Sequence, residues 1–158
     1  MSTLKRSIIV FVLFALAACS GTPTATPTAA PTASPFTENH QKWEAQNVTH
    51  YRYKVDLLCF CAFRDKMPLT IEVDNGQTVS ILDNQGQQIT ESLEVFERYD
   101  SIEAIFSTVD AALNGEADKI EVEYNSEYGF PQSANIDYIE EAIDDELTFT
   151  VSDFEVLQ

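Results

Sequence analysis

Apolar and polar side chains alternate along much of the chain after residue 50. An apolar side chain at every second position predicts a strand with one face in a core. The strands predicted in this way cover residues 51–63, 67–73, 79–81, 120–124, 134–138 and 147–156. Asn75-Gly76 predicts a tight turn between the second and third strands, because this pair tolerates positive φ. The apolar phase slips late in the last strand, which predicts a bulge at Ser152-Asp153.

One segment in the middle of the chain has a different period. Between residues 102 and 113 the apolar side chains are spaced by three and four, which predicts a helix. Asp100 and Glu103 predict its capped start, and Asn114-Gly115 predicts a left-handed end. The order βββ-α-βββ predicts an α+β domain, in which an antiparallel sheet of about six strands carries one helix packed on a face.

The chain begins with the features of a secretory signal. Lys5 and Arg6 precede eleven apolar residues, Ile8–Ala18. This run is too short to span a bilayer, which takes about 20 residues. The break Leu16-Ala17-Ala18-Cys19 resembles the lipobox of bacterial lipoproteins. An ordinary signal peptide or an uncleaved anchor, with an incidental cysteine, is the alternative interpretation.

The lipobox resemblance implies a processed and acylated protein. Cys19 would receive a diacylglyceryl group through its thiol, and cleavage before it would expose an amino group that is then acylated. Ser20 in place of an aspartate implies the outer membrane where the organism has one, and otherwise the outer face of the cytoplasmic membrane. We therefore expect a signal peptide at 1–18, the lipidated cysteine and a tether at 19–35, and one domain at 36–158.

Residues 20–35 have the composition of a tether. They are Thr, Pro, Ala, Ser and Gly without a charge, and the repeated prolines block helix and sheet. Such a segment extends to at most about 50 Å. The net charge of the whole chain is −17, which suits a domain held away from anionic lipid.

The net negative charge also argues against one class of partner, nucleic acids. Nucleic-acid binding requires a face rich in Lys and Arg, and this chain has 9 of them against 26 Asp and Glu. We expect a monomer that contacts membrane lipid through Cys19, and an envelope protein or ligand that the sequence does not identify.

Cys59 and Cys61 remain as an even pair in an oxidising compartment. On a regular strand their Cα atoms would lie about 6.6 Å apart, near the upper limit for a disulfide, so a bridge requires a local kink. A disulfide, a buried reduced pair, a soft-metal site and a redox centre all remain open. His40 and His50 are the only imidazoles available to complete a metal site. Phe60 falls on the polar side of its strand, and is either exposed or covered by the segment around Trp43.

An acidic run follows the fifth predicted strand. It consists of Asp137, Glu140, Glu141, Asp144, Asp145 and Glu146. Carboxylates are ligands for hard cations such as Ca²⁺, but the spacing is not that of an EF-hand. A solvated connection and a paired acid and base are the alternatives. The chain has no nucleophile elbow, phosphate loop or zinc-protease motif, so we expect a non-catalytic protein without a cofactor.

Several short motifs occur in one order along the domain. They are Trp43, Tyr51-Arg52-Tyr53, Cys59-Phe60-Cys61, Asn75-Gly76, Tyr128-Gly129-Phe130-Pro131 and Asp144-Asp145-Glu146. Over about residues 43–157 this pattern resembles a family of uncharacterised bacterial lipoprotein domains. The resemblance implies fold and location but no activity. The sequence thus favours a non-catalytic binding or structural module, with an envelope metal-binding or redox protein that uses Cys59 and Cys61 as the alternative.

The lipid anchor can be tested by replacing its acceptor. We expect Cys19→Ala to prevent acylation and to leave no processed protein in the membrane fraction, because no other thiol lies at the cleavage point. Labelling with radioactive fatty acid and membrane fractionation measure both effects. A cleaved variant that stays in the membrane would contradict the assignment, whereas an uncleaved precursor held by its signal would not.

Overall fold

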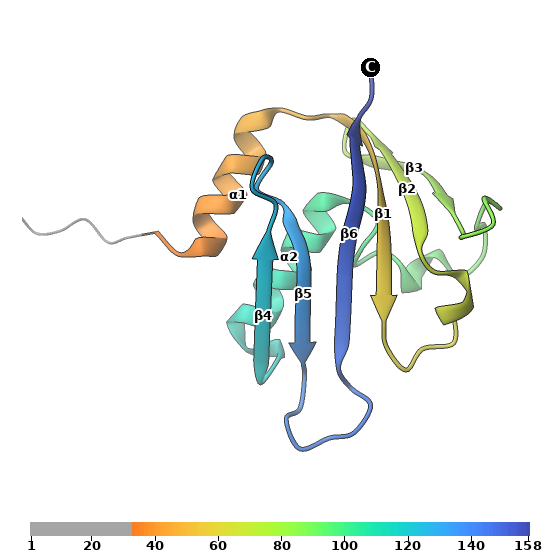
Figure 1. The fold of residues 1–158 in the computed structure, drawn as a ribbon. Helices are drawn as coiled ribbons and strands as arrows, with labels where there is room; N and C mark the ends of the chain where they lie inside the picture. The colour runs from red at the N-terminus through yellow and green to blue at the C-terminus, as the bar shows by residue number, and fades with distance from the viewer. Residues whose placement is uncertain (1–32) are drawn as a thin grey trace, which may run out of the picture. The chain divides into compact units, whose positions relative to one another are not determined.

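The computed structural model describes residues 33–158, and in them six strands form one antiparallel sheet (Figure 1). The predicted signal peptide, Cys19 and nearly all of the tether lie outside this range. The strands are β1 His50–Leu58, β2 Leu69–Asp74, β3 Gln77–Leu82, β4 Lys119–Tyr124, β5 Pro131–Asp137 and β6 Leu147–Val156. Their order across the sheet is β3-β2-β1-β6-β5-β4. Two three-stranded meanders therefore lie side by side and are joined by the pairing of β1 with β6.

Helix α2, Ile102–Ala111, connects the two meanders and packs on one face of the sheet (Figure 1). Its cap is Ser101, whose Oγ accepts a hydrogen bond from the Ala104 amide at 3.1 Å. The predicted start at Asp100 is therefore wrong by one residue. The helix continues into a wider turn of π type, Ala112–Glu116, where Gly115 has a φ of 105°. The predicted left-handed end is confirmed there.

A second helix, α1 Pro35–Gln46, precedes the sheet and was not predicted. The described order is α-βββ-α-βββ, and the folded unit begins ahead of residue 36. Trp43 is the only buried residue of α1, so the helix shows no apolar stripe in the sequence. Its signal is local instead, because Ser34 caps the helix and Pro35 occupies the first turn, where proline is tolerated. Within residues 33–158, neither helix combines the length and hydropathy needed to cross a membrane.

The core lies between the helices and the inward face of the sheet. Tyr51, Tyr53, Val55 and Leu57 of β1 are buried there, which confirms the predicted alternation. However, β1 ends at Leu58 and not at residue 63, because the chain turns at Cys59. β2 likewise begins at residue 69, after a cis peptide bond between Met67 and Pro68, rather than at residue 67.

The bulge predicted in the last strand is confirmed. Ser152 lies opposite Lys54 and Glu155 lies opposite Arg52, so β6 has one more residue than β1 over this interval. Asp153 takes up the extra residue with a φ of 49°. The bulge brings Asp153 and Glu155 onto the outward face of the sheet, next to the two cations of β1.

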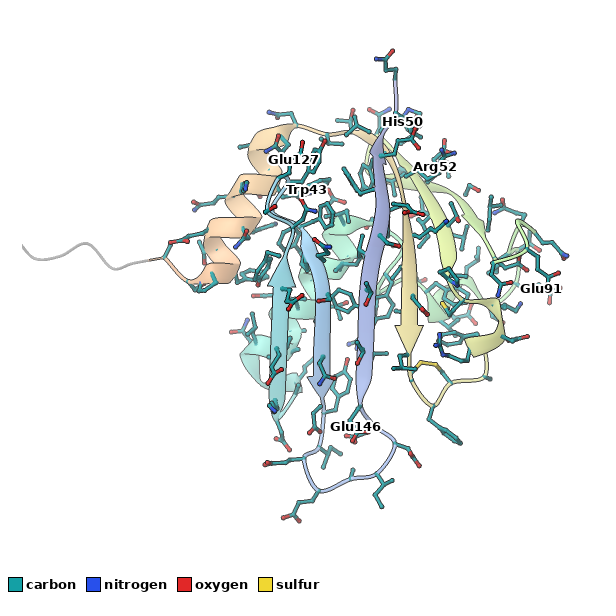
Figure 2. All side chains as sticks on the ribbon, viewed as in Figure 1. Trp43, His50, Arg52, Glu91, Glu127 and Glu146 are labelled. Carbon is teal, nitrogen blue, oxygen red and sulfur yellow. A yellow bond between two sulfur atoms is a disulfide. The ribbon has the colours of Figure 1, made fainter. Side chains whose placement is uncertain are left out.

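Three side chains fasten α1, α2 and β1 to one another. The Tyr51 hydroxyl donates to Glu103 Oε2 at 2.8 Å and accepts from the Ile102 amide at 3.1 Å. The indole of Trp43, which points from α1 toward the sheet in Figure 2, donates to Glu103 Oε1 at 3.1 Å. Burial, followed by the negative charge of Glu103, raises the pKa of Tyr51 well above its usual range, so the hydroxyl keeps its proton. The hydrogen bond to the Tyr51 hydroxyl also gives a partner to the Ile102 amide, which has none within α2.

The contact of α1 with the β4–β5 turn depends on a glycine. Gly129 has a φ of 89°, and a Cβ there would lie 2.6 Å from the Asn39 carbonyl oxygen of α1. Gly86 has a similar φ of 76° with nothing within 4 Å, and so provides a matched control. We expect Gly86→Ala to lower the free energy of unfolding by about 1 kcal/mol, the cost of the left-handed backbone alone. Gly129→Ala should cost at least about twice as much.

Chemical denaturation of both variants measures this difference. Equal losses of unfolding free energy in the two variants would show that α1 does not contact the β4–β5 turn as closely as described.

Candidate functional site

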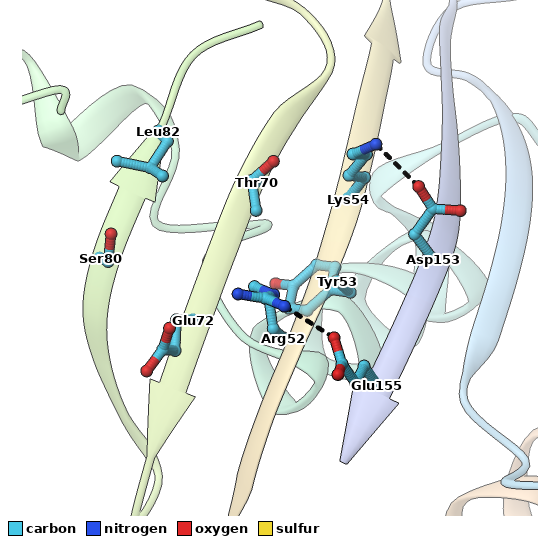
Figure 3. Close-up of a pocket in the computed structure, with 9 residues that line it drawn as sticks. All are labelled: Arg52, Tyr53, Lys54, Thr70, Glu72, Ser80, Leu82, Asp153 and Glu155. Atoms are coloured by element: carbon cyan, nitrogen blue, oxygen red, sulfur yellow. Dashed lines mark hydrogen bonds and ion pairs between the residues drawn. The ribbon is translucent and has the colours of Figure 1, made fainter. Parts of the chain in front are cut away.

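The outward face of the sheet carries a polar hollow of about 340 Å³ across β3, β2, β1 and β6 (Figure 3). Arg52 Nη2 lies 2.7 Å from Glu155 Oε2, and Lys54 Nζ lies 2.8 Å from Asp153 Oδ2. Both ion pairs join β1 to β6 across the bulge. Such half-exposed pairs stabilise a fold by at most about 1 kcal/mol each. Both cations are thus already paired with carboxylates of β6. We therefore interpret these side chains as reinforcing the pairing of β1 with β6, and not as a binding site for a charged ligand.

A second hollow is apolar and lies between the start of α1, the end of α2 and the inward side of β4. Its volume is about 510 Å³. Its apolar lining consists of Pro35, Phe36, Leu113, Ile120, Val122 and Tyr124. We call it the β4 groove. Leu113 is 48% exposed, and the three β4 side chains are only half-buried. On β5 the inward residues Ala134 and Ile136 are fully covered, so the helical layer stops short of the last strand.

The strand beside this groove is an open edge. β4 is the last strand of the sheet, and no other strand among residues 33–158 pairs with its outer side. An edge strand presents unpaired amide and carbonyl groups at every second residue. The opposite edge differs, because Ile89 donates its amide to the Ile81 carbonyl of β3 at 2.9 Å, and Leu82 pairs with Gln88. β4 therefore combines a free hydrogen-bonding edge with an apolar groove.

The structure pairs Cys59 and Cys61 at disulfide distance in the loop after β1 (Figure 2). Their Cα atoms lie 5.3 Å apart, closer than two positions of a regular strand, which explains why β1 ends before them. The expectation that both lie on a strand is wrong, although the kink required for a bridge is present. Both side chains are half-buried, and Cys59 packs against the core. Bonded sulfur atoms are not thiolate ligands, so the pairing favours the disulfide over the metal site.

The acidic run begins at the end of β5 and fills the loop before β6. Glu140, Glu141, Asp144 and Glu146 are exposed. Partial desolvation, followed by the charges of nearby carboxylates, raises the pKa of Asp137. Asp145 is the exception, since both its carboxylate oxygens are shielded and have no hydrogen-bond partner in the described part of the chain.

No group of three or more His, Cys, Asp or Glu within residues 33–158 is arranged to hold a metal ion. His50 instead lies 3.2 Å from Glu72, and the His40 ring packs against Phe106. The two histidines therefore lie away from the cysteine pair and the acidic run, and the sequence-predicted residues do not form one metal site within residues 33–158.

The β4 groove was not predicted from the sequence. The alternation of Ile120, Val122 and Tyr124 indicated a strand with one apolar face. Whether that strand is central or at an edge depends on the pairing order, which periodicity does not contain. The one available signal was the alternating charge of Lys119, Glu121 and Glu123, since charged side chains are typical of protected edges.

A family model matches residues 35–156, from the first residue of α1 to the last residue of β6, and its description is a family of unknown function, DUF6174. The chain belongs to the DUF6174 family. The expectation that the domain belongs to a family of unknown function is confirmed, and the match begins at α1. Neither the curated proteins nor the solved structures contain a significant match to this chain.

The role of the Cys59–Cys61 disulfide can be tested by removing it. The bridge encloses one residue, so chain entropy limits its stabilisation to roughly 1–2 kcal/mol. We expect Cys59→Ala/Cys61→Ala to fold and to melt only slightly below the wild type. A chelator should change the melting temperature of neither the wild type nor the double variant.

Melts followed by circular dichroism, with and without chelator, measure this. A large chelator-dependent loss in the wild type alone would favour the metal site, because metal-binding free energy then contributes to folding.

Proposed function

We propose that this chain is a lipid-anchored protein of the cell envelope whose DUF6174 domain is a non-catalytic binding module. The lipobox around Cys19 and the uncharged, proline-rich residues 20–35 support the anchor and the tether. The β4 groove and its open edge support the binding role, and this juxtaposition is the observation that carries the proposal.

The groove and the edge together suit an extended peptide. A strand that pairs with β4 would gain main-chain hydrogen bonds, and alternate side chains would point to opposite faces. Those on the inward side would enter the β4 groove between Phe36, Leu113 and Val122. Strand addition of this kind derives affinity from the backbone and specificity from the pocket.

The charges near β4 indicate which side chains the partner should place on the outward side of the sheet. On the outward side the added side chains would lie beside Lys119, Glu121 and Glu123, which carry two negative charges and one positive charge and are all exposed. Asp110 adds a further carboxylate at the groove. A partner segment that alternates apolar and basic residues complements this surface. A second copy of the chain is disfavoured, because each copy carries a net charge of −17.

A defined peptide tests the proposal. We expect Lys-Val-Lys-Tyr-Lys-Val-Lys to shift the amide resonances of β4 and Leu113 in the isotopically labelled full-length protein. Leu113→Ser should weaken binding about fivefold, since it removes part of the apolar area buried by the peptide. Leu113 is about half-exposed, so the fold should tolerate this change.

Val79→Ser is the matched control, because Val79 is an exposed apolar residue of the opposite edge strand. It should leave the affinity unchanged. A Glu-Val-Glu-Tyr-Glu-Val-Glu peptide should not bind. Resonance shifts that map elsewhere, or equal effects of the two variants, would contradict binding at β4.

A further inference from the structure

Two loops leave the sheet at the same end. β1 and β6 are antiparallel, and Leu58 at the end of β1 lies opposite Thr148 at the start of β6. The loop after β1 and the loop before β6 are therefore neighbours, at the lower end of the sheet in Figure 1. The end of β1 and these two loops carry large exposed apolar side chains, namely Leu58, Phe60, Ile139 and Ile143. We call these two loops, residues 58–63 and 138–146, the loop end.

Phe60 is the most distinctive residue of the loop end. Its side chain is 87% exposed, and it stands between the two paired cysteines. The same loop contains Phe63, which turns inward and packs edge-on against Phe96 with ring centroids 5.0 Å apart. Phe63 therefore packs against the core, whereas the side chain of Phe60 does not.

The backbone that presents Phe60 is held at both sides. The disulfide closes the chain around this one residue. The Arg64 guanidinium donates to Asp56 Oδ1 at 2.6 Å and to the Leu57 carbonyl at 3.2 Å, which ties the returning arm of the loop to β1. An aromatic side chain on a constrained backbone loses little conformational entropy when it binds.

The neighbouring loop carries a high negative charge. Residues 138–146 contain five carboxylates and no Lys or Arg. Partial desolvation and then the charges of Asp145, Glu146 and Glu140 raise the pKa of Asp137 at its base. Ile143, which is also 87% exposed, lies within this acidic segment. Exposed apolar side chains next to carboxylates complement an apolar pocket rimmed by basic side chains.

We propose that the loop end is a protein-docking surface, in which Phe60 enters an apolar pocket of a partner whose rim carries Lys or Arg. It is a different surface from the β4 groove, and it gives a common role to the Cys-x-Cys motif and the acidic run. A buried aromatic side chain is typical of the few residues that dominate the energy of an interface. Anionic membrane is a poor alternative partner, because the carboxylates of the loop would be repelled from it.

The test uses a random library of 12-residue peptides displayed on phage and selected on the full-length protein in detergent. We expect the enriched peptides to combine apolar and basic residues. Phe60→Ala should weaken their binding at least about tenfold. Glu141→Gln/Asp144→Asn should weaken it severalfold, and more at low salt than at high salt. Cys59→Ala/Cys61→Ala should also weaken it, because Phe60 is then no longer held.

Two exposed residues elsewhere serve as controls. Val79→Ala removes an apolar side chain of β3, and Glu91→Gln removes a charge from another loop. Neither should alter peptide affinity, and all variants should melt within a few degrees of the wild type. The alternating Lys-Val peptide should not displace the selected peptides, which separates this surface from the β4 groove.

Three outcomes would overturn the proposal. Selection could yield no peptide whose binding depends on Phe60, or it could yield acidic or uncharged peptides. Stronger sedimentation of the wild type than of Phe60→Ala with phosphatidylcholine vesicles, beyond the sedimentation that acylated Cys19 gives to both, would instead assign the loop end to a lipid surface.

Discussion

The pairing of β1 with β6 is the interaction on which the rest of this fold depends. Each meander by itself is a three-stranded sheet with one apolar face, and only the central pair makes them continuous. The partners lie about a hundred residues apart in the chain, so this pairing bears the largest loop-closure cost. Cross-strand ion pairs of Arg52 and Lys54 reinforce it on the outward face, where the β6 bulge supplies the two carboxylates.

The helices then determine which part of the sheet stays open. Glu103 binds Trp43 of α1 and Tyr51 of β1, and so holds both helices over the sheet. Both helices are short, and their ends, at Pro35 and Ala111, leave the inward side of β4 half-covered. The groove is therefore a consequence of helix length and position, combined with a strand order that puts β4 at the edge.

The two surfaces proposed for binding both combine apolar side chains with carboxylates, but they differ in geometry. The β4 groove offers a linear edge for an extended segment, whereas the loop end offers a single constrained aromatic residue. Carboxylates border both, in keeping with a chain that has 26 acidic and 9 basic residues. A basic partner is thus attracted to either surface at long range, while short-range shape separates a strand from a pocket.

Local features were readable from the sequence, including the strands, α2, the Gly115 helix end and the Ser152-Asp153 bulge, because each rests on side chains within a few residues of one another. α1 escaped prediction because it buries one residue, Trp43, and so leaves no periodic signal. The strand order, the open edge of β4 and the exposure of Phe60, which the sequence left either exposed or covered by the segment around Trp43, were decided only by tertiary packing. They depend on contacts between distant segments, and periodicity within one segment holds no information about its partner.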